Sequence, residues 1–319
     1  MPKNLPKYCK SFSPRSKLNP SGLNVSPGAP NKPILLLSVI EMITTGQITQ
    51  NQIAFNAELI ATFLKLWSYL EPTRKPDIGL PFYHLTNDRF WHYQMKPGFE
   101  GLIAAKIKIR TPSTIRGTVD YAYLDDELWL LLQNESHRAV LTHTLISSWF
   151  NNNQDIESLL QVNAFAEVEE QLRSQGGKIY QPEELKDEQK VIVRDGAFRK
   201  IIVSTYNYSC AFCGLQILDT KSQNIVDGSH IKPFFKFYDD RINNGLSLCK
   251  NHHWAFDRGW FAIDDDYRII VAEDIREVSP NGKPMREMGG DRINLPVQEQ
   301  YYPSLDALRW HRENMFNAA

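Results

Sequence analysis

The sequence predicts an α+β protein with two domains, the first mainly helical with a small sheet and the second built around a cluster of metal-type ligands. Three observations predict this fold class. Apolar residues recur at helical spacing through much of the first half of the chain. The 319 residues suffice for two domains that each bury a core. Residues 210–257 combine cysteines and histidines at ligand spacing with short strand and helix patterns.

Two helices are predicted to follow a basic N-terminal segment. Residues 1–31 are rich in Pro, Ser, Asn and Lys, which predicts an extended basic arm that partly packs on the first domain. Pro33 suits the first position of a helix, and the apolar spacing after it predicts a helix that ends at Gly46. A second helix is predicted from about 56 to 70, because its apolar residues form one stripe.

Short strands are predicted next, followed by further helices. Two of the predicted strands flank a turn. In the third, charged and apolar residues alternate toward the end, which places three cations on one face and isoleucines on the other. Helical periodicity then returns. The predicted elements are strands at 80–85, 89–94 and 102–110 and helices at about 124–150 and 155–174, and the cations are Lys106, Lys108 and Arg110.

A polar, charged stretch separates the two predicted domains. It begins with two consecutive glycines and interrupts the apolar pattern, as domain linkers do. The predicted organisation is an arm at 1–31, a first domain at 32–174, a linker at 175–190 and a second domain at 191–319. Within the second domain we expect a helix at 191–206, a strand at 225–231, a hairpin at 259–272 and a final helix at 303–316 capped by Ser304.

Composition excludes several classes of protein. No apolar run is long enough to span a membrane, and the first thirty residues lack the apolar region of a signal peptide. Three of the four cysteines lie in the 210–249 cluster, which favours a reducing cytoplasm over a secreted disulfide framework. The net charge of −1 excludes bulk attraction to nucleic acid, but basic stretches at 1–40 and 96–116 can still dock on phosphates.

Two ligand pairs predict a structural zinc site. Cys210 and Cys213 are separated by two residues, and so are Cys249 and His252. Two such pairs make a Cys3His set that can grip one tetrahedral ion. A single Cys-x-x-Cys pair could instead be redox-active. The second pair favours zinc over that reading and over buried free thiols.

A second group of residues suits catalysis. His253 and Asp257 are four apart and share a helix face, which suits a divalent ion, although an ordinary surface pair has the same spacing. His230 lies in a predicted strand, where a lone histidine is usually structural, but histidine is also the natural general base near neutral pH. Asn244 is either a turn residue or the residue that holds the loop beside His230.

The ordered pattern Ser-His-Ile-x-Pro, Asn-Gly-Leu-x-Leu-Cys-x-x-His-His-x-x-Phe-Asp resembles the HNH endonucleases and is close to the HNH domains of McrA-like, modification-dependent restriction enzymes. The resemblance covers about residues 191–275 and implies a ββα-metal fold that hydrolyses DNA. It implies that His230 is the general base and that Asn244 orients its loop. It also implies that His253, assisted by Asp257, binds the catalytic ion, Mg²⁺ or Mn²⁺.

One position departs from that family pattern. Many HNH enzymes place a metal ligand directly before the base, where this chain has Ser229, a poor ligand. Asp227 lies two residues earlier and therefore on the same strand face as Ser229. We expect Asp227 to contribute to the catalytic ion, directly or through water.

Three short motifs stand out within about residues 20–150 of the first domain: Asn31-Lys32-Pro33-Ile-Leu-Leu-Leu, Leu80-Pro-Phe-Tyr-His84-Leu and Phe90-Trp91. With them the domain resembles the sulfur-binding domains that are fused to some HNH restriction enzymes and read phosphorothioate-modified DNA. Such a reader needs an apolar niche for sulfur and cations for the neighbouring phosphates. The expected DNA-binding residues are Lys32, Tyr83, His84, Lys106, Lys108, Arg110 and Arg116, with Pro81 and Trp91 as further niche candidates.

The resemblances together imply an enzyme that restricts sulfur-modified, double-stranded foreign DNA, with alternatives left open. The aromatic side chains could be plain core and the cations a solvated edge. An HNH nuclease could read another DNA modification or be targeted by a partner protein. A non-catalytic, zinc-containing nucleic-acid-binding protein is a third reading. Cutting both strands favours a homodimer, although no coiled-coil heptads are present.

Overall fold

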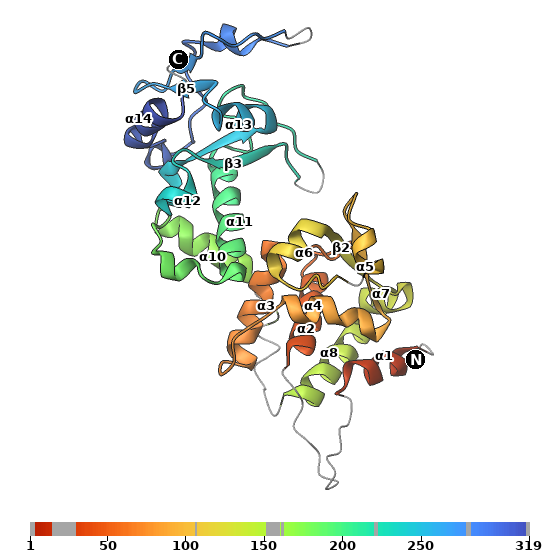
Figure 1. Ribbon diagram of the computed structural model, residues 1–319. Helices are drawn as coiled ribbons and strands as arrows, with labels where there is room; N and C mark the ends of the chain where they lie inside the picture. Colours follow the sequence, from red (N-terminus) through yellow and green to blue (C-terminus); the bar gives the residue numbers. More distant parts are fainter. Residues whose placement is uncertain are drawn as a thin grey trace. The chain divides into compact units, whose positions relative to one another are not determined.

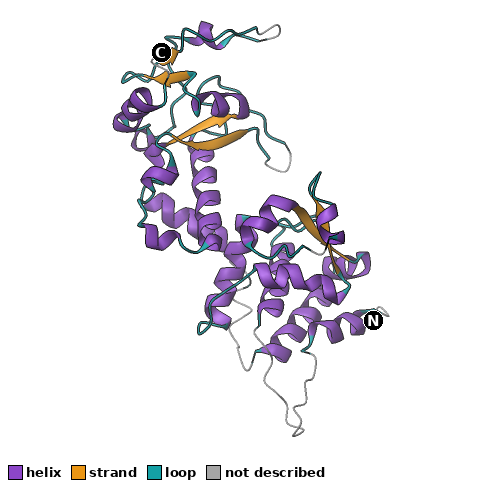
Figure 2. Cartoon of the chain, in the orientation of Figure 1, coloured by secondary structure: helices purple, strands orange, loops and turns teal. Residues whose placement is uncertain are grey.

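The computed structural model describes residues 4–14, 30–105, 107–150, 160, 163–219, 223–278 and 282–316. Its contacts divide the chain into two compact units. Unit 1 comprises Met1–Phe165 and Glu188–Val193, and unit 2 comprises Ala166–Asp187 and Arg194–Ala319. Helices dominate and the strands form short antiparallel pairs (Figure 2), so the predicted α+β class is confirmed. Across the described ranges, no helix is long and apolar enough to cross a membrane.

Unit 1 is built around helix α2 (Asn31–Thr44), in which every residue from Pro33 to Ile43 is buried. Helices α3 (Ala57–Leu70) and α8 (Glu135–Trp149) both pack against it (Figure 1). Asn56 caps α3, because its Oδ1 accepts a hydrogen bond from the Leu59 amide at 3.0 Å. The first two predicted helices are therefore present.

The segment expected to be an extended arm contains helix α1 (Leu5–Phe12). Leu5, Tyr8 and Phe12 are buried, and α1 packs against α8. The indole Nε1 of Trp149 donates to the Phe12 carbonyl at 2.7 Å. The apolar stripe that makes this helix is short and lies among lysines and prolines, which hid it in the sequence. Residues 15–29 of the predicted arm lie outside the described residues.

The strand predicted at 80–85 is wrong, because these residues form helix α4 (Gly79–His84) and the 3-10 turn η1 (Leu85–Asp88). Pro81 is tolerated in the first turn of a helix. The Asp77 carboxylate accepts from the Leu80 amide at 3.1 Å and so caps this turn. A Cβ atom on Gly79 would lie 2.0 Å from the Arg110 carbonyl oxygen, so only glycine allows this close approach.

The strand predicted at 102–110 is also wrong. The structure has the short helix α5 (Gly101–Ala104) and then an irregular segment. Ile109 is buried at 2% exposure whereas Ile107 is 49% exposed, so the alternation reflects one anchored side chain in a loop. Lys108 and Arg110 are exposed but share no strand face. Lys106 lies outside the described residues.

The sheet of unit 1 is a hairpin of β1 (Trp91–Met95) and β2 (Val119–Leu124). Strand β1 matches the prediction for 89–94, whereas β2 had no predicted counterpart. Trp91 pairs with Leu124, and Ala122 bridges Ile53 on the other side of β2. Two helices, α7 (Asp126–Gln133) and α8, follow where one helical region was predicted at 124–150. Among its described residues, unit 1 also contains helix α6 (Pro112–Thr118).

Glu41 of α2 is an unusual core residue, because its side chain is buried and burial raises its pKa to about 7 against the lowering effect of Lys65. Folding thus favours the protonated carboxyl, and the stability of unit 1 falls as pH rises from about 4.5 through 7.

We expect Glu41→Gln to stabilise unit 1 at pH 9 by on the order of 3 kcal/mol, because each unit of raised pKa corresponds to about 1.4 kcal/mol. The gain should vanish near pH 4. Urea unfolding at both pH values measures it, and an equal gain at both would contradict it.

Unit 2 is built on the hairpin of β3 (Val226–His230) and β4 (Gly245–Cys249), which continues directly into helix α13 (Lys250–Phe256). Helix α11 (Glu188–Thr205), which belongs to unit 2 from Arg194 onward, covers one face of this hairpin (Figure 1). A Cβ on Gly245 would lie 2.3 Å from the Ile202 side chain. The two glycines opposite α11, Gly228 and Gly245, therefore let the helix approach the strands.

The other elements of unit 2 surround this strand–strand–helix core. The elements predicted at 191–206, 225–231, 259–272 and 303–316 are present, and Ser304 precedes the last helix without a side-chain cap. The remaining elements are α10 (Ala164–Ser174), η2 (Pro182–Leu185), α12 (Phe234–Phe237), η3 (Ile242–Asn244), β5 (Phe261–Ile263), β6 (Ile269–Val271), η4 (Met285–Met288), η5 (Glu299–Tyr301) and α14 (Leu305–Asn314).

Candidate active site and metal centre

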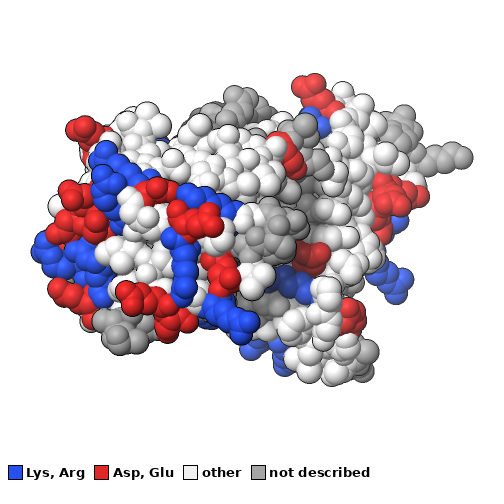
Figure 3. Space-filling view, turned by 90° about the horizontal axis from the view of Figure 1, so that it is seen from above, with Lys and Arg blue, Asp and Glu red and all other residues white. Residues whose placement is uncertain are grey.

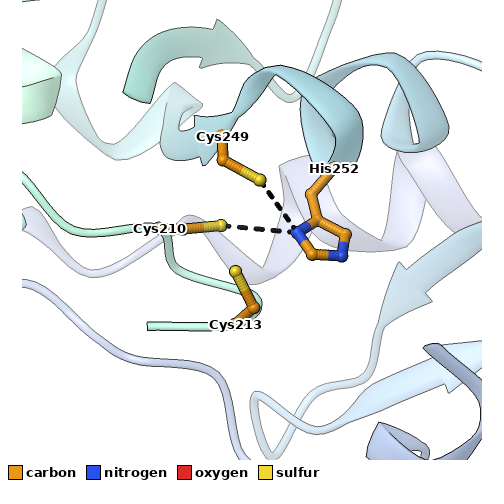
Figure 4. A group of neighbouring side chains, drawn as sticks. All are labelled: Cys210, Cys213, Cys249 and His252. Atoms are coloured by element: carbon orange, nitrogen blue, oxygen red, sulfur yellow. Dashed lines mark hydrogen bonds between the residues drawn. The ribbon is translucent and has the colours of Figure 1, made fainter. Parts of the chain in front are cut away.

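The two ligand pairs meet in unit 2. Cys249 ends β4 and precedes α13, so it and His252 lie on one helical turn, while Cys210 and Cys213 lie on a turn after α11. The four ligand atoms all lie within 4.8 Å of one another (Figure 4). Nδ1 of His252 is 3.7 Å from Cys210 Sγ and 3.1 Å from Cys249 Sγ. Ligands around tetrahedral zinc are separated by roughly 3.5–3.8 Å, given Zn–S of about 2.3 Å and Zn–N of about 2.0 Å. The arrangement therefore fits a zinc ion.

Packing holds these ligands in place. The Phe212 ring stacks on His252 with 4.1 Å between centroids. The Ala211 amide donates to the Ser247 carbonyl at 2.7 Å, which ties the cysteine turn to β4. Contacts with Cys210 and Cys213 hold the pKa of Cys249 well below its ordinary range. A thiolate is the form of cysteine that binds metal.

His230 ends β3 and is enclosed on three sides. Its ring stacks on Phe198 of α11 with 3.9 Å between centroids and an interplanar angle of 4°. Phe234 lies 5.5 Å away. Nε2 of His230 is 2.8 Å from Oδ1 of Asp240, and the His230 side chain is 11% exposed. Nη1 of Arg194 in turn lies 2.8 and 2.7 Å from the two Asp240 oxygens.

Asn244 joins the end of β3 to the loop that follows it. Its Oδ1 accepts from the Lys232 amide at 2.9 Å, and its Nδ2 donates to the Asp239 carbonyl at 2.9 Å. Its own carbonyl accepts from the Ile231 amide at 2.9 Å. Asn244 is 1% exposed. These contacts tie the end of β3 to the loop that ends at Asp239.

His253 lies on α13 between the two carboxylates predicted to join it. Nδ1 is 3.7 Å from Asp227 Oδ2, and Nε2 is 3.5 Å from Asp257 Oδ2. The two carboxylates therefore lie against different ring nitrogens. A metal ion bound to one ring nitrogen of His253 would therefore have one of the two carboxylates beside it, and not both. Among the described residues, the Cys3His set is the group compact enough to hold a metal without rearrangement.

The Asp227 carboxylate is also paired with cations. Its Oδ2 accepts from Arg199 Nη1 at 2.8 Å and from Lys250 Nζ at 3.2 Å. Burial works to raise the pKa of Asp227, but the charges of Arg199 and Lys250 outweigh it and hold the pKa below its ordinary value. Asp227 thus stays ionised, as a metal ligand must be.

Asp257 differs from Asp227 in its electrostatic surroundings. Burial raises the pKa of Asp257 against the lowering effects of His253, Arg258 and Arg199. Ser229 is 2% exposed, and within the described part of the chain its hydroxyl has no hydrogen-bond partner. It offers no accessible ligand.

Three residues at this site had no predicted role: Arg194, Phe198 and Asp240. Arg194 and Phe198 are four apart, so they share the face of α11 that packs on His230. That spacing is the one sequence signal for them. Asp240 lies ten residues after His230 in an irregular loop, where no local pattern marks it.

The predicted DNA-binding residues of unit 1 have different surroundings. Lys32 is engaged in the fold itself, because its Nζ donates to the Ser11 carbonyl at 2.9 Å and pairs with Asp88 at 3.0 Å. Tyr83 is half-buried and its ring contacts the exposed His84 at 5.0 Å. Lys108, Arg110 and Arg116 are exposed. On the face in Figure 3, acidic and basic side chains are interspersed with uncharged areas, and no single basic field covers it.

A cavity of about 340 Å³ lies in unit 1 beside two of the predicted niche residues, Tyr83 and Trp91. Its walls are mostly aromatic rings and isoleucines. Trp91 is 1% exposed. The other two niche candidates, Pro81 and His84, do not line the cavity, because Pro81 is buried core and His84 is exposed. The lining residues are Tyr83, Thr86, Trp91, His92, Tyr93, Ile103, Ile107, Ile109 and Tyr123.

Comparison with known proteins identifies the core of unit 2. Residues 210–264 match the family model described as HNH endonuclease. No curated protein matches the chain. Among solved structures, the chain is similar to a modification-dependent restriction endonuclease, TagI, with 26% identity and a TM-score of 0.30 over 39% of each chain. The match therefore spans less than half of that protein. The strand–strand–helix core with its two ligand pairs is an HNH domain in the C-terminal part of this chain.

Proposed function

We propose that this protein is a metal-dependent DNA endonuclease that hydrolyses phosphodiester bonds at the HNH site. The observation that carries the proposal is the placement of His230 and His253 within an HNH domain, each with a carboxylate at its ring. An HNH domain with a positioned histidine base and an adjacent metal-type histidine suits hydrolysis of DNA. A zinc protein that only binds nucleic acid needs neither of these histidines.

His230 is the proposed general base. It takes a proton from a water molecule, and the water attacks the phosphorus of the scissile phosphodiester. Asn244 keeps the loop beside His230 in place through its contacts with Lys232 and Asp239. His253 would hold the catalytic ion together with Asp257 or Asp227. Mg²⁺ or Mn²⁺ bound there supplies charge stabilisation to the phosphorus and the leaving 3′ oxygen.

The Cys3His set is proposed to hold a structural zinc ion. Its ligands come from the turn after α11, the end of β4 and the first turn of α13. Zinc at this position would fasten the turn after α11 to the end of β4 and to α13, the helix that carries His253. All four positions are taken by protein ligands, as is usual for structural and not for catalytic zinc.

The proposed substrate is double-stranded foreign DNA that carries a phosphorothioate link. The cavity beside Tyr83 and Trp91 supports this targeting, because its apolar walls suit a sulfur atom better than a charged oxygen. Its volume falls in the range of small-molecule sites, about 300–1,000 Å³, so a sulfur could enter with part of its sugar. The exposed Lys108 is flanked in the sequence by two lining residues, Ile107 and Ile109, and we assign it to a neighbouring phosphate.

Cleavage of paired substrates tests this function. With Mg²⁺ or Mn²⁺, the full chain is expected to cut a duplex that carries a phosphorothioate link and to leave the same plain duplex intact. The His230→Ala variant, which should bind without cutting, is expected to bind the sulfur-containing duplex more tightly in a gel-shift assay. Equal cleavage and binding of both duplexes would remove the sulfur targeting. Cleavage of neither duplex with either ion would contradict the nuclease proposal.

The size of the cavity also favours a second targeting mode. A single sulfur atom has a volume comparable with that of one water molecule, about 30 Å³, far less than the cavity. A larger DNA modification would fill it better. If plain and sulfur-containing duplexes behave alike, the same assays on base-modified duplexes test an HNH nuclease directed to another mark.

A further inference from the structure

We infer that Asp240, held by Arg194, fixes His230 in the tautomer and orientation that a general base requires. This role rests on the proposed nuclease function. Nε2 of His230 lies 2.8 Å from Oδ1 of Asp240, whose side chain is 1% exposed. An ionised carboxylate accepts hydrogen bonds and donates none. Nε2 therefore carries the ring proton, and Nδ1 keeps the lone pair that removes a proton from water.

Arg194 pairs with both oxygens of the buried Asp240 carboxylate. A buried charge is stable in a protein when an opposite charge is hydrogen-bonded to it. Here the guanidinium, which is always charged, lies 2.8 and 2.7 Å from the two carboxylate oxygens. The Arg194 side chain is only 10% exposed and its guanidinium lies 3.4 Å over the Phe234 ring. Asp240 is thereby a permanent acceptor for His230.

Tyr180 is a further titratable group beside Asp240 and Arg194. Burial, reinforced by the negative charge of Asp240, raises the pKa of Tyr180 to about 12. Tyr180 is therefore neutral at physiological pH and adds no second negative charge. The ionised Asp240 and Arg194 balance each other, so a neutral His230 is compatible with this buried cluster.

Aromatic packing and Asn244 complete the restraint. The parallel contact between Phe198 and the His230 ring, at 3.9 Å, blocks one face of the imidazole. A half-turn of the ring would keep this stack but place Cε1 in the position of Nε2, so the turned ring would lose the bond to Asp240. Asn244 donates to the carbonyl of Asp239, directly before Asp240, and accepts from the amide of Lys232, two residues after His230. One amide side chain thus holds both halves of the pair.

The chemical consequence resembles that of other histidine–carboxylate pairs. When Nδ1 takes a proton from water, the imidazolium is stabilised by the Asp240 carboxylate, which does not itself take up the proton. Asp240 touches neither DNA nor the attacking water in this scheme. It is a positioning residue for His230.

Asp240→Asn is the decisive substitution. The new amide can either donate to Nε2 or accept from it, so the tautomer is no longer imposed. We expect kcat for DNA cleavage to fall by about 10²–10⁴-fold while KM for DNA stays unchanged. Asp265→Asn is the matched control, because it removes a carboxylate that pairs with Arg309 and Arg312 at the surface. Cleavage by that control should equal cleavage by the parent. Zinc content and melting temperature report whether each variant is folded.

Nitrogen-15 NMR of histidine-labelled, full-length protein reads the tautomer without any cleavage. The His230 signals are assigned by difference from the His230→Ala variant. We expect a protonated Nε2 and a non-protonated Nδ1 in the parent, and a mixture in Asp240→Asn. A proton on Nδ1 in the parent overturns the inference. So does an Asp240→Asn variant that cleaves at the parent rate, or one that loses cleavage with its tautomer unchanged. Cleavage by a folded His230→Ala protein refutes the base assignment and with it the role of Asp240. If the parent cleaves no duplex, the nuclease proposal fails, and the NMR result alone decides whether Asp240 fixes the tautomer.

Discussion

Replacing His230 by alanine is expected to abolish measurable DNA cleavage, since general-base catalysis contributes about 10²–10⁴-fold and a nuclease has few other ways to activate water. The side chain is 11% exposed and packs on Phe198, so the substitution also removes one ring contact from α11. The Cys3His ligands do not contact His230, and bound zinc should stay at the parent level. Conversion of supercoiled plasmid to nicked and linear forms, with Mg²⁺ or Mn²⁺, measures the effect.

A matched control separates loss of the base from loss of the fold. His143 is an exposed histidine of α8 in unit 1, so His143→Ala removes an imidazole without touching the HNH domain. Its cleavage rate should equal that of the parent. Comparable melting temperatures and zinc contents for the two variants would show that His230→Ala is folded. Retained cutting by a folded His230→Ala protein would refute the assignment of the base.

The secondary structure that was predicted well is the part that depends on long periodic patterns. The helices at 31–44 and 57–70 carry continuous apolar stripes and clear ends. The errors fall on short apolar runs, for which strand and helix look alike. Residues 79–84 form a helix and not the predicted strand, because Asp77 accepts a hydrogen bond from the Leu80 amide and Gly79 packs closely against the Arg110 carbonyl. The contact between Gly79 and Arg110 is not visible in the sequence. Strand β2 exists because β1 pairs with it, a long-range condition.

The candidate site divides in the same way. The two ligands of each pair are close in the sequence, so their spacing alone predicted the Cys3His set. The fold brings the four ligand atoms within 4.8 Å of one another. The surroundings of His230 were not predictable in that manner. Arg194 and Asp240 are 46 residues apart, and their contact requires α11 to lie across the hairpin. Asp227 and Asp257 lie against different ring nitrogens of His253, and this placement also depends on the fold. Strand alternation predicts the face of the strand on which Asp227 lies, but it does not predict which nitrogen of His253 the carboxylate approaches.

Removing the structural metal is expected to unfold unit 2 while leaving unit 1 folded. Structural zinc supplies an apparent binding free energy of about 10–16 kcal/mol in small domains. That equals or exceeds the whole stability of a typical domain, about 5–15 kcal/mol. Unit 1 contains one cysteine, Cys9, and no ligand set of this kind among its described residues. Hydrogen exchange followed by mass spectrometry, before and after treatment with a strong zinc chelator, measures protection in each unit separately.

Cys213→Ser sharpens this test, because it removes one ligand and little packing. Cys210 and Cys249 are buried, whereas Cys213 is only half-buried. A serine there changes one atom, so a large effect would arise from lost metal affinity and not from a cavity. We expect less than one zinc per chain by elemental analysis and rapid exchange in β3, β4 and α13. Cys9→Ser, the control, should keep one zinc and full protection. Full protection of these elements in a zinc-free chain would show that packing alone holds the HNH core, and the metal would then lose its proposed structural role.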